Sequence, residues 1–244
     1  MARHGKRYAE GREKIDRERA YTPLEAVRLV KEAPAAKFDE SVEAHFNLGL
    51  NVRHADQQLR GTLMLPHGTG KDVRIAVFAE GEKAREAEEA GADVVGSADL
   101  AAQIEEGFDD FDVAVATPDM MATVGKLGRI LGPRGKMPNP KAGTVTFDIG
   151  KAVRDSKAGK LEYRTDRGAN VHLSIGKKSF GERQLLENYA TVIEEIVRAK
   201  PSAAKGRYIH SITLTSSMGP GIHVDTQRTR AIAEEEIEEA PVPA

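Results

Sequence analysis

The hydrophobic pattern of this chain changes character twice, and this change limits the folds that the chain can adopt. Residues 42–50, and residues 207–216 near the other end, alternate apolar with polar side chains. Such alternation is typical of strands with one buried face. Between them, residues 73–79, 92–96 and 111–116 form mostly apolar runs separated by helical patterns. That arrangement is typical of a parallel sheet covered on both faces.

The pattern therefore predicts two domains of different class. An antiparallel α+β domain is built from both chain ends, residues 1–67 and 158–230. A Rossmann-like parallel α/β domain, residues 68–157, is inserted into it. Residues 231–244 hold five glutamates and no basic residue, and we expect them to form an acidic disordered tail.

Two local features are predicted near the N-terminus. The segment through Ala20 is basic and lacks sustained periodicity, so we expect a mobile arm. Thr22 and Glu25 have the spacing of a capping box, with Pro23 at the first helical position, and they predict the start of a helix.

Composition excludes several classes of protein. The 244 residues include no cysteine, which excludes disulfides and thiol catalysis and makes a structural zinc site unexpected. No apolar run approaches the roughly 18 residues that a membrane span requires. The charged first twenty residues lack the apolar core of a secretion signal. We therefore expect a cytoplasmic protein without membrane contact.

The net charge of −2 hides an uneven distribution. Residues 68–157 hold 12 Lys and Arg against 16 Asp and Glu, a net charge of −4. Residues 1–67 and 158–230 together hold 24 against 17, a net charge of +7. This division suggests a polyanion site on the split domain. An ordinary solvated surface remains the alternative.

The sequence does not satisfy the motifs for catalysis or nucleotide binding, because other residues stand at the positions that these motifs require. Gly68 to Lys71 resembles a phosphate-binding loop, but Leu65 stands where an upstream glycine is required and Asp72 where Ser or Thr would bind magnesium. We predict no cofactor, no metal and no catalytic residue. An enzyme that uses the α/β domain on a phosphorylated small molecule remains the alternative function.

The run from Thr213 to Gly221 predicts a strand that ends at a sharp Gly-Pro-Gly turn. Thr213, Thr215 and Ser217 would then share one face. Hydroxyls beside a glycine turn suit close contact with a sugar-phosphate backbone. The alternative is a hairpin edge whose threonines are present for their β-propensity.

The loop of residues 128–141 is rich in glycine and proline and carries four basic side chains, Arg129, Arg134, Lys136 and Lys141. It could contact phosphates. It could equally be a rigid loop that docks on a sheet edge or on the other domain, and composition does not separate the two.

Four stretches carry a specific resemblance. They are AKFDESVE at 36–43, RGT with LPHG between 60 and 68, MATVGKLGRILGPRGKMPNP at 121–140, and SITLTSSMGPG at 211–221. In this order along the chain, the four stretches resemble the sequence motifs of the bacterial large-subunit ribosomal protein L-one family, whose members are the proteins of the mobile ribosomal stalk. The resemblance covers residues 5–226, and the acidic tail after Arg230 goes beyond it.

The resemblance implies a non-catalytic ribosomal protein with the two-domain fold. It implies binding to large-subunit ribosomal RNA at the mobile stalk near the tRNA exit site, and repression of the protein's own operon mRNA through an rRNA-like site. Transfer RNA in the exit site is a further expected partner, and the protein off the ribosome is expected to be a monomer.

The resemblance also places RNA-binding residues on the split domain. They are Lys37, Phe38, Ser41, His172, Gly176, Lys177, Ser211, Thr215, Ser217, Met218 and Gly219. For two of them another role is open from the residues alone. Phe38 could be a buried core residue, and Met218 could simply close the turn.

Only two crossings connect the predicted domains. Pro66 and Gly68 lie in the first, and Ala158 and Gly159 lie in the second. Glycine permits large backbone rotations, while a double crossing restricts motion. We therefore expect these four residues to form a hinge.

Overall fold

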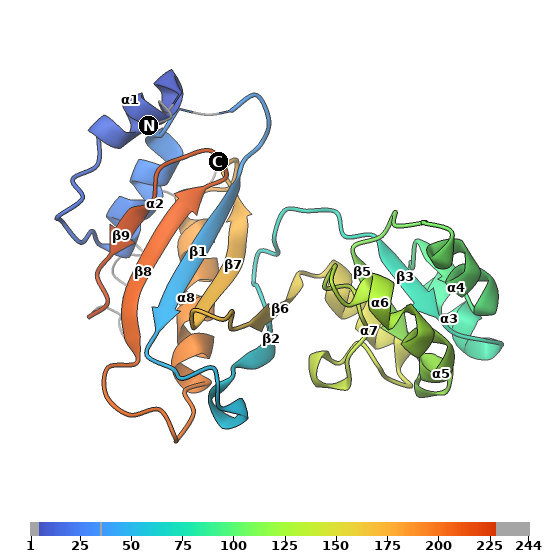
Figure 1. Cartoon of the computed structure of the whole chain (residues 1–244). Coiled ribbons are helices and arrows are strands. Elements are labelled where there is room, and N and C mark those ends of the chain that lie inside the picture. Colours follow the sequence, from blue (N-terminus) through green and yellow to red (C-terminus); the bar gives the residue numbers. More distant parts are fainter. Residues whose placement is uncertain (1–4, 35, 228–244) are drawn as a thin grey trace. The chain divides into compact units, whose positions relative to one another are not determined.

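The computed structural model describes residues 5–34 and 36–227 (Figure 1). The chain divides into two compact units. The first contains residues 1–70 and 163–244, and the second contains residues 71–162. The mixed fold class predicted from the pattern is confirmed, with an antiparallel sheet in the first unit and a parallel sheet in the second.

The first unit is built on an antiparallel sheet in the order β7-β1-β8-β9. Its strands are β1 (Ser41–Leu48), β7 (Asn170–Lys177), β8 (Ile209–Ser216) and β9 (Ile222–Val224). Every second residue of β1 is buried, from Val42 to Leu48, as the alternation predicted. The central strand β1 therefore pairs on both sides with segments from the far end of the chain.

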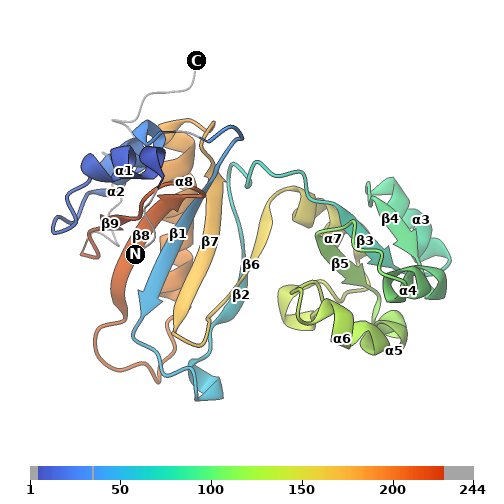
Figure 2. The same ribbon diagram turned by 45° about the horizontal axis from the view of Figure 1, so that its top comes forward.

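Helices cover one face of this sheet (Figures 1 and 2). Helix α2 (Pro23–Glu32) packs against β8 and β9, and helix α8 (Glu182–Arg198) packs against β7 and α2. The capping box at Thr22 is confirmed, because its hydroxyl accepts from the Glu25 amide at 3.2 Å and the Glu25 carboxylate accepts from the Thr22 amide at 3.1 Å. The outward face of the sheet presents polar side chains.

The N-terminal arm differs from its prediction. Helix α1 (Lys6–Glu13) forms there, with Gly11 buried. A Cβ on Gly11 would lie 3.3 Å from Pro34 Cδ and 3.4 Å from Pro220 Cδ. The close approach that glycine permits holds the helix to the body of the unit, and apolar periodicity could not reveal this.

Strands β2 (Arg60–Met64) and β6 (Lys160–Arg164) form a separate two-stranded sheet. A short 3₁₀ helix, Ala55–Gln57, precedes β2. Within the described ranges, no helix is both long and apolar enough to cross a membrane.

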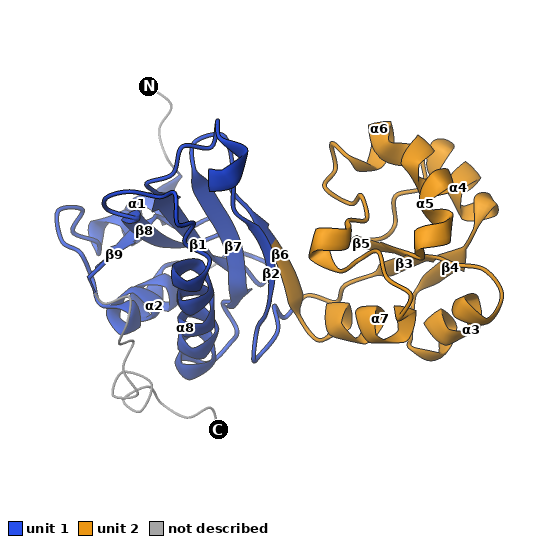
Figure 3. Ribbon diagram, turned by 90° about the horizontal axis from the view of Figure 1, so that it is seen from below, with its two compact units in different colours: residues 1–70, 163–244 blue, residues 71–162 orange. Residues whose placement is uncertain are grey.

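The second unit contains a parallel sheet in the order β4-β3-β5 (Figure 3). Its strands are β3 (Ile75–Phe78), β4 (Val94–Gly96) and β5 (Val113–Ala116). All four residues of β3 are buried, with Ala76 and Phe78 in one apolar cluster and Ile75 and Val77 in another. Both faces of the sheet are therefore covered, as the continuous apolar runs predicted.

The helices of the second unit supply these clusters. Helices α3 (Glu82–Glu89) and α7 (Ile149–Lys157) contribute to one, and helices α4 (Ala98–Glu105), α5 (Met121–Val124) and α6 (Gly128–Leu131) contribute to the other. In the sequence, Thr117, Pro118 and Asp119 predict the start of a helix that runs towards Leu127 or Leu131. The structure instead has short segments, Pro118–Met120, α5, Gly125–Leu127 and α6, in a stretch where Gly125 and Gly128 weaken a continuous helix.

Candidate RNA interface

Two segments distant in sequence meet at one end of the antiparallel sheet. They are the loop of residues 36–40 that leads into β1 and the turn of residues 216–219 that follows β8. The Ser217 amide donates to the Ser41 carbonyl at 3.1 Å, and the Ser41 amide donates to Ser217 Oγ at 3.1 Å. One backbone–backbone bond and one bond to the Ser217 side chain thus join the two segments.

The side chain of Glu40 holds both segments in place by hydrogen bonds. Its side chain is fully buried. One carboxylate oxygen accepts from the Ala36 amide at 2.6 Å, and the other accepts from the Met218 amide at 3.1 Å. Burial raises the pKa of Glu40, but the hydrogen bonds that it accepts and the charge of Lys178 outweigh burial and hold the pKa below its ordinary value. A buried, ionised carboxylate thus sets the path of both segments.

No sequence motif marks Glu40 or Lys178 as a site residue. Lys178 donates from Nζ to the Ala33 carbonyl at 2.5 Å, and its amide donates to the Glu40 carbonyl at 2.8 Å. Both residues lie in polar stretches that look solvated in sequence. Their roles depend on contacts between segments more than 130 residues apart, which no local pattern encodes.

Two large apolar side chains are exposed on the segments that Glu40 joins. Phe38 is 57% exposed and Met218 is 63% exposed. The alternative that Phe38 is a buried core residue is therefore wrong. Exposed apolar side chains on a fixed backbone can stack on bases or pack against riboses, and stacking of this kind carries much of the affinity of RNA-binding surfaces.

Basic side chains border these apolar residues. Lys37 is exposed and forms no ion pair with any described residue. Lys177 lies at the end of β7 and donates from Nζ to Ser41 Oγ at 3.0 Å. Both can neutralise phosphate groups.

The hydroxyl groups differ in what they can still offer to a ligand. Thr215 Oγ1 lies 3.0 Å from the Ser216 carbonyl and 3.2 Å from that of Gly219, so its single proton is used within the turn. Towards RNA it can only accept. Ser217 Oγ lies 3.4 Å from the Ser41 carbonyl, a weak contact from which its proton can be redirected to a ribose hydroxyl.

The two predicted glycines have structural roles of their own. A Cβ on Gly219 would lie 2.4 Å from Ser216 Oγ, so a larger residue there would force the Ser216 side chain to move. Gly176 is buried, with φ +151°, and a Cβ would lie 2.8 Å from Phe180 Cδ2 and 2.9 Å from Leu185 Cδ2. Substitution at either position would disturb the fold before it tested RNA contact.

The remaining two predicted residues lie further along the outward face of the sheet. His172 is exposed on β7 and faces His45 across the strand pair. Ser211 is exposed on β8 and faces Asn47, near the opposite end of β1 from Ser41. The structure therefore brings nine predicted residues together at the turn and places these two on the outward face.

The basic loop of the second unit is largely committed to its own unit. Lys136 Nζ donates to Asp109 Oδ1 and to the Phe111 carbonyl, each at 2.6 Å, and lies 4.9 Å from the centroid of the Phe111 ring. Arg134 forms an ion pair with Asp109 at 3.1 Å. For these two residues the contacts favour the docking role that composition left open.

The predicted hinge residues lie in contrasting surroundings. The Asn188 side chain, fully buried in α8, accepts from the His67 amide at 3.1 Å and donates to the Gly68 carbonyl at 3.0 Å. In the second crossing, Ala158 ends α7 and Gly159 has φ +102°. The first crossing is thus pinned to the first unit at residues 67 and 68.

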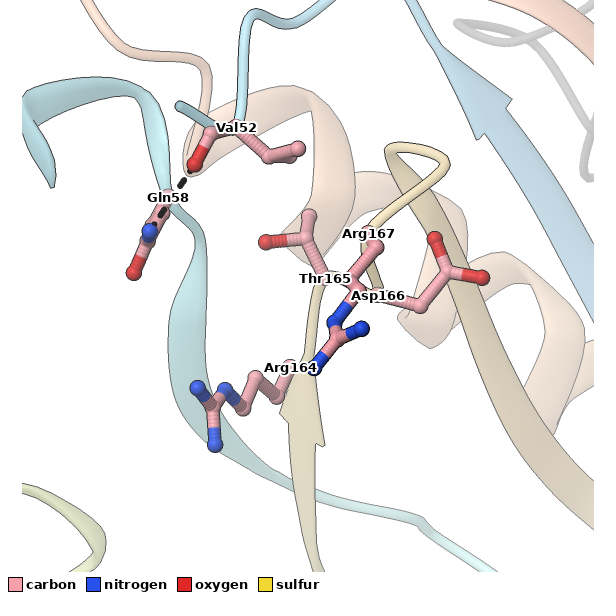
Figure 4. A pocket seen from close by; sticks show the side chains of 6 residues that line it. All are labelled: Val52, Gln58, Arg164, Thr165, Asp166 and Arg167. Atoms are coloured by element: carbon pink, nitrogen blue, oxygen red, sulfur yellow. Dashed lines mark hydrogen bonds between the residues drawn. The ribbon is translucent and has the colours of Figure 1, made fainter. Parts of the chain in front are cut away.

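A separate cavity of about 430 Å³ lies in the first unit (Figure 4). It is lined by Val52, Gln58, Arg164, Thr165, Asp166 and Arg167. Its charged lining consists of two arginines and one aspartate, and neither arginine forms an ion pair with a described residue. No sequence motif selected it.

Comparisons with known proteins agree with the resemblance. The sequence profile of a family described as "Ribosomal protein L1p/L10e family" matches residues 29–220. The chain is 60% identical over 231 residues to the "Large ribosomal subunit protein uL1" of Thermobifida fusca, covering 95% of this chain and 98% of that protein. It is 63% identical over 222 residues to the protein of that name from Rubrobacter xylanophilus, covering 91% and 96%. For Frankia alni the identity is 58% over 235 residues, covering 96% and 99%.

Proposed function

Because the chain belongs to the ribosomal protein L1p/L10e family, we propose that it is a constituent of the large ribosomal subunit that binds large-subunit ribosomal RNA. The family is one of structural ribosomal proteins, so the chain is not the metabolic enzyme considered as an alternative. Its site of action is the cytoplasmic ribosome.

The RNA-binding surface in this proposal consists of residues 37–41, Lys177 and residues 215–219. One observation supports it above the others. Phe38 and Met218 are exposed although both are large and apolar, and the buried Glu40 fixes the backbone on which they stand. Fixed apolar side chains lose little conformational entropy on binding, so their contact with bases or riboses contributes directly to affinity.

The finer partners follow from the same surface. RNA with the shape of the ribosomal site would bind there in either context, so an rRNA-like site on the protein's own operon mRNA would compete with ribosomal RNA. Such competition would repress translation when the protein is in excess. Transfer RNA near the exit site, and a monomeric state off the ribosome, complete the proposal.

The test compares two exposed phenylalanines. Phe38→Ala should weaken binding to large-subunit ribosomal RNA by about 1–3 kcal/mol, the cost of losing one stacked base, with little change in melting temperature. Phe147, in the second unit, is 63% exposed, and Phe147→Ala is the matched control that should leave affinity unchanged. Affinity would be measured by filter binding, and the bound region located by footprinting on total ribosomal RNA.

Equal affinity for the Phe38→Ala variant, the Phe147→Ala variant and the parent protein would contradict the proposed surface. A complete absence of protection on ribosomal RNA would contradict the proposed function. Competition between the protected fragment and the leader of the operon mRNA would test autoregulation separately.

A further inference from the structure

A row of histidines crosses the outward face of the antiparallel sheet. The strand register places His172 of β7 opposite His45 of β1, His45 opposite Thr213 of β8, and Thr213 opposite His223 of β9. His45 Nδ1 lies 2.8 Å from His172 Nδ1, and Thr213 Oγ1 lies 3.3 Å from His223 Nδ1. The row adjoins the proposed RNA-binding surface along the same strands.

The two central imidazoles are held between two carboxylates. His45 Nε2 lies 3.6 Å from a Glu43 oxygen, and His172 Nε2 lies 3.5 Å from an Asp166 oxygen. The contacts thus form a continuous series from Glu43 through His45 and His172 to Asp166. All four side chains are between 28% and 53% exposed, so a ligand can reach them.

This geometry limits how many protons the pair can hold. A hydrogen bond between the two Nδ1 atoms needs one N–H donor and one acceptor. A pair with one proton on each Nε2, facing its carboxylate, and one proton between the two Nδ1 atoms holds three ring protons and one positive charge. A fourth proton would place two N–H donors face to face, so that hydrogen bond would break and a ring would turn its N–H outwards.

Because of the charges around the pair, a fourth proton would favour the binding of a polyanion. Glu43 on β1 and the Asp166 carboxylate before β7 are negative. On the described strands of this face, the outward positions between the turn and the Asn47 row carry no lysine or arginine. Lys177 lies at the turn, where its Nζ is bonded to Ser41, and Arg167 lines the cavity that Asp166 also lines. Among the outward positions of these strands, the side chains that can carry positive charge under an RNA phosphate are therefore the histidines, including His223 on β9.

Burial lowers the pKa of His45, and the neighbouring His172 lowers it further, while Glu43 raises it. The free protein therefore resists the additional proton near neutral pH. A phosphate group above the pair would reverse this balance, because an adjacent negative charge favours the protonated ring.

We propose that the His45–His172 pair is a proton-linked RNA contact, at which phosphates of the bound strand lie over the sheet and binding takes up a proton. This inference rests on the proposed function. It extends the RNA-binding surface from the turn along the outward face, and it links affinity to pH. By linkage, one proton taken up changes the affinity by at most about tenfold per pH unit between the free and bound pKa values.

The experiment measures affinity and proton uptake together. The parent protein is titrated with the ribosomal RNA fragment that it protects in footprinting, at pH 6.0, 7.0 and 8.0. Calorimetry in two buffers of different ionisation enthalpy counts the protons taken up. We expect tighter binding at lower pH and net uptake of protons at pH 7.0.

His45→Gln and His172→Gln should each flatten the pH dependence and reduce the proton count. His210 is exposed at the start of β8, outside the row, and His210→Gln is the matched control that should keep the parent pH dependence. Nitrogen-15 NMR of the imidazoles gives an independent readout, since RNA should raise the pKa of His45 in the parent protein.

The possible results separate this inference from the function beneath it. Binding that is tight at every pH, with no proton uptake and unshifted histidine resonances, would overturn the proton-linked contact and leave the proposed function intact. Absence of binding to ribosomal RNA at any pH would overturn both.

Discussion

Glu40 is the residue on which the proposed surface depends most. Its carboxylate is buried, ionised and bonded to the amides of Ala36 and of Met218, and Met218 lies 178 residues beyond Glu40 in the chain. Removing one partner from a buried polar contact leaves the other unsatisfied, which costs more than the bond itself contributes. The residue therefore links the stability of the first unit with the arrangement of Phe38 and Met218.

Glu40→Gln should lower the free energy of unfolding by about 1–3 kcal/mol at pH 7, and it should weaken RNA binding. The amide can keep only one acceptor oxygen, so its NH₂ group would face an N–H donor. Urea denaturation and filter binding measure the two effects. Glu32 is exposed on α2, and Glu32→Gln is the control that should change neither.

The difference in unfolding free energy between the parent and Glu40→Gln proteins depends on pH in a definite direction. The folded-state pKa of Glu40 lies below its ordinary value. The stability that it contributes is thus fully present above the unfolded pKa of about 4.3 and is lost as pH falls through the folded pKa. The parent and Glu40→Gln proteins should converge in stability in strong acid, and a constant difference down to low pH would contradict this account.

At the scale of elements, short-range pattern predicted most strands and several helices. The alternation of residues 42–48 and the apolar run at 75–78 encode one-sided and two-sided burial directly in side-chain order. Helix α1 was missed because its contact is made by a glycine, Gly11, against two distant prolines. The helix predicted after residue 118 is interrupted, since Gly125 and Gly128 weaken the continuous helix that the apolar residues favour.

The candidate site was predictable only in part for the same reason. Nine residues selected by resemblance lie at the turn, yet nothing local marks Glu40 as buried. Its environment is created by residues 216–218, and this pairing arises only when β1 enters the sheet beside β8. The cavity lined by Arg164 and Arg167 was missed because its lining comes from two segments far apart in the sequence, residues 52–58 and 164–167.

The basic loop of the second unit supplies an element-scale prediction. Lys136→Met should destabilise this unit by about 1–3 kcal/mol, because it removes bonds to Asp109 and to the Phe111 carbonyl. Lys141→Met should not, since the Lys141 side chain is exposed and forms no ion pair with a described residue. Thermal unfolding measures both, and equal melting temperatures would show that the loop is not held by Lys136.

At the scale of the whole molecule, the chain passes between its units twice. Asn188 pins residues 67 and 68, and Gly70, with φ +66°, packs so closely that a Cβ would lie 2.7 Å from Phe180 Cε1. We propose that the expected hinge turns just beyond this anchored segment in the first crossing and at Ala158 and Gly159 in the second.

Asn188→Asp should loosen the first crossing, because a carboxylate cannot donate to the carbonyls of Gly68 and Ile175. Spin labels at Glu32 and Asp119, one on each unit, report the separation. We expect RNA to shift the distance distribution in the parent protein and Asn188→Asp to broaden it. The side chain of Asn51 uses its oxygen as acceptor from the Arg53 amide. A carboxylate can accept in the same way, so Asn51→Asp is the control. Identical distributions in all samples would contradict the hinge.

The central position of β1 has a consequence for the order in which the protein can be made. A nascent chain releases β1 early, but its two sheet neighbours are β7 and β8, which are translated more than 120 residues later. The second unit is contiguous and can fold first during synthesis. The segments joined by Glu40 meet only after Met218 has left the exit tunnel, so a shorter nascent chain would lack the proposed RNA-binding surface. The proposed repression would then respond to chains that have passed this point and not to chains that have only been initiated.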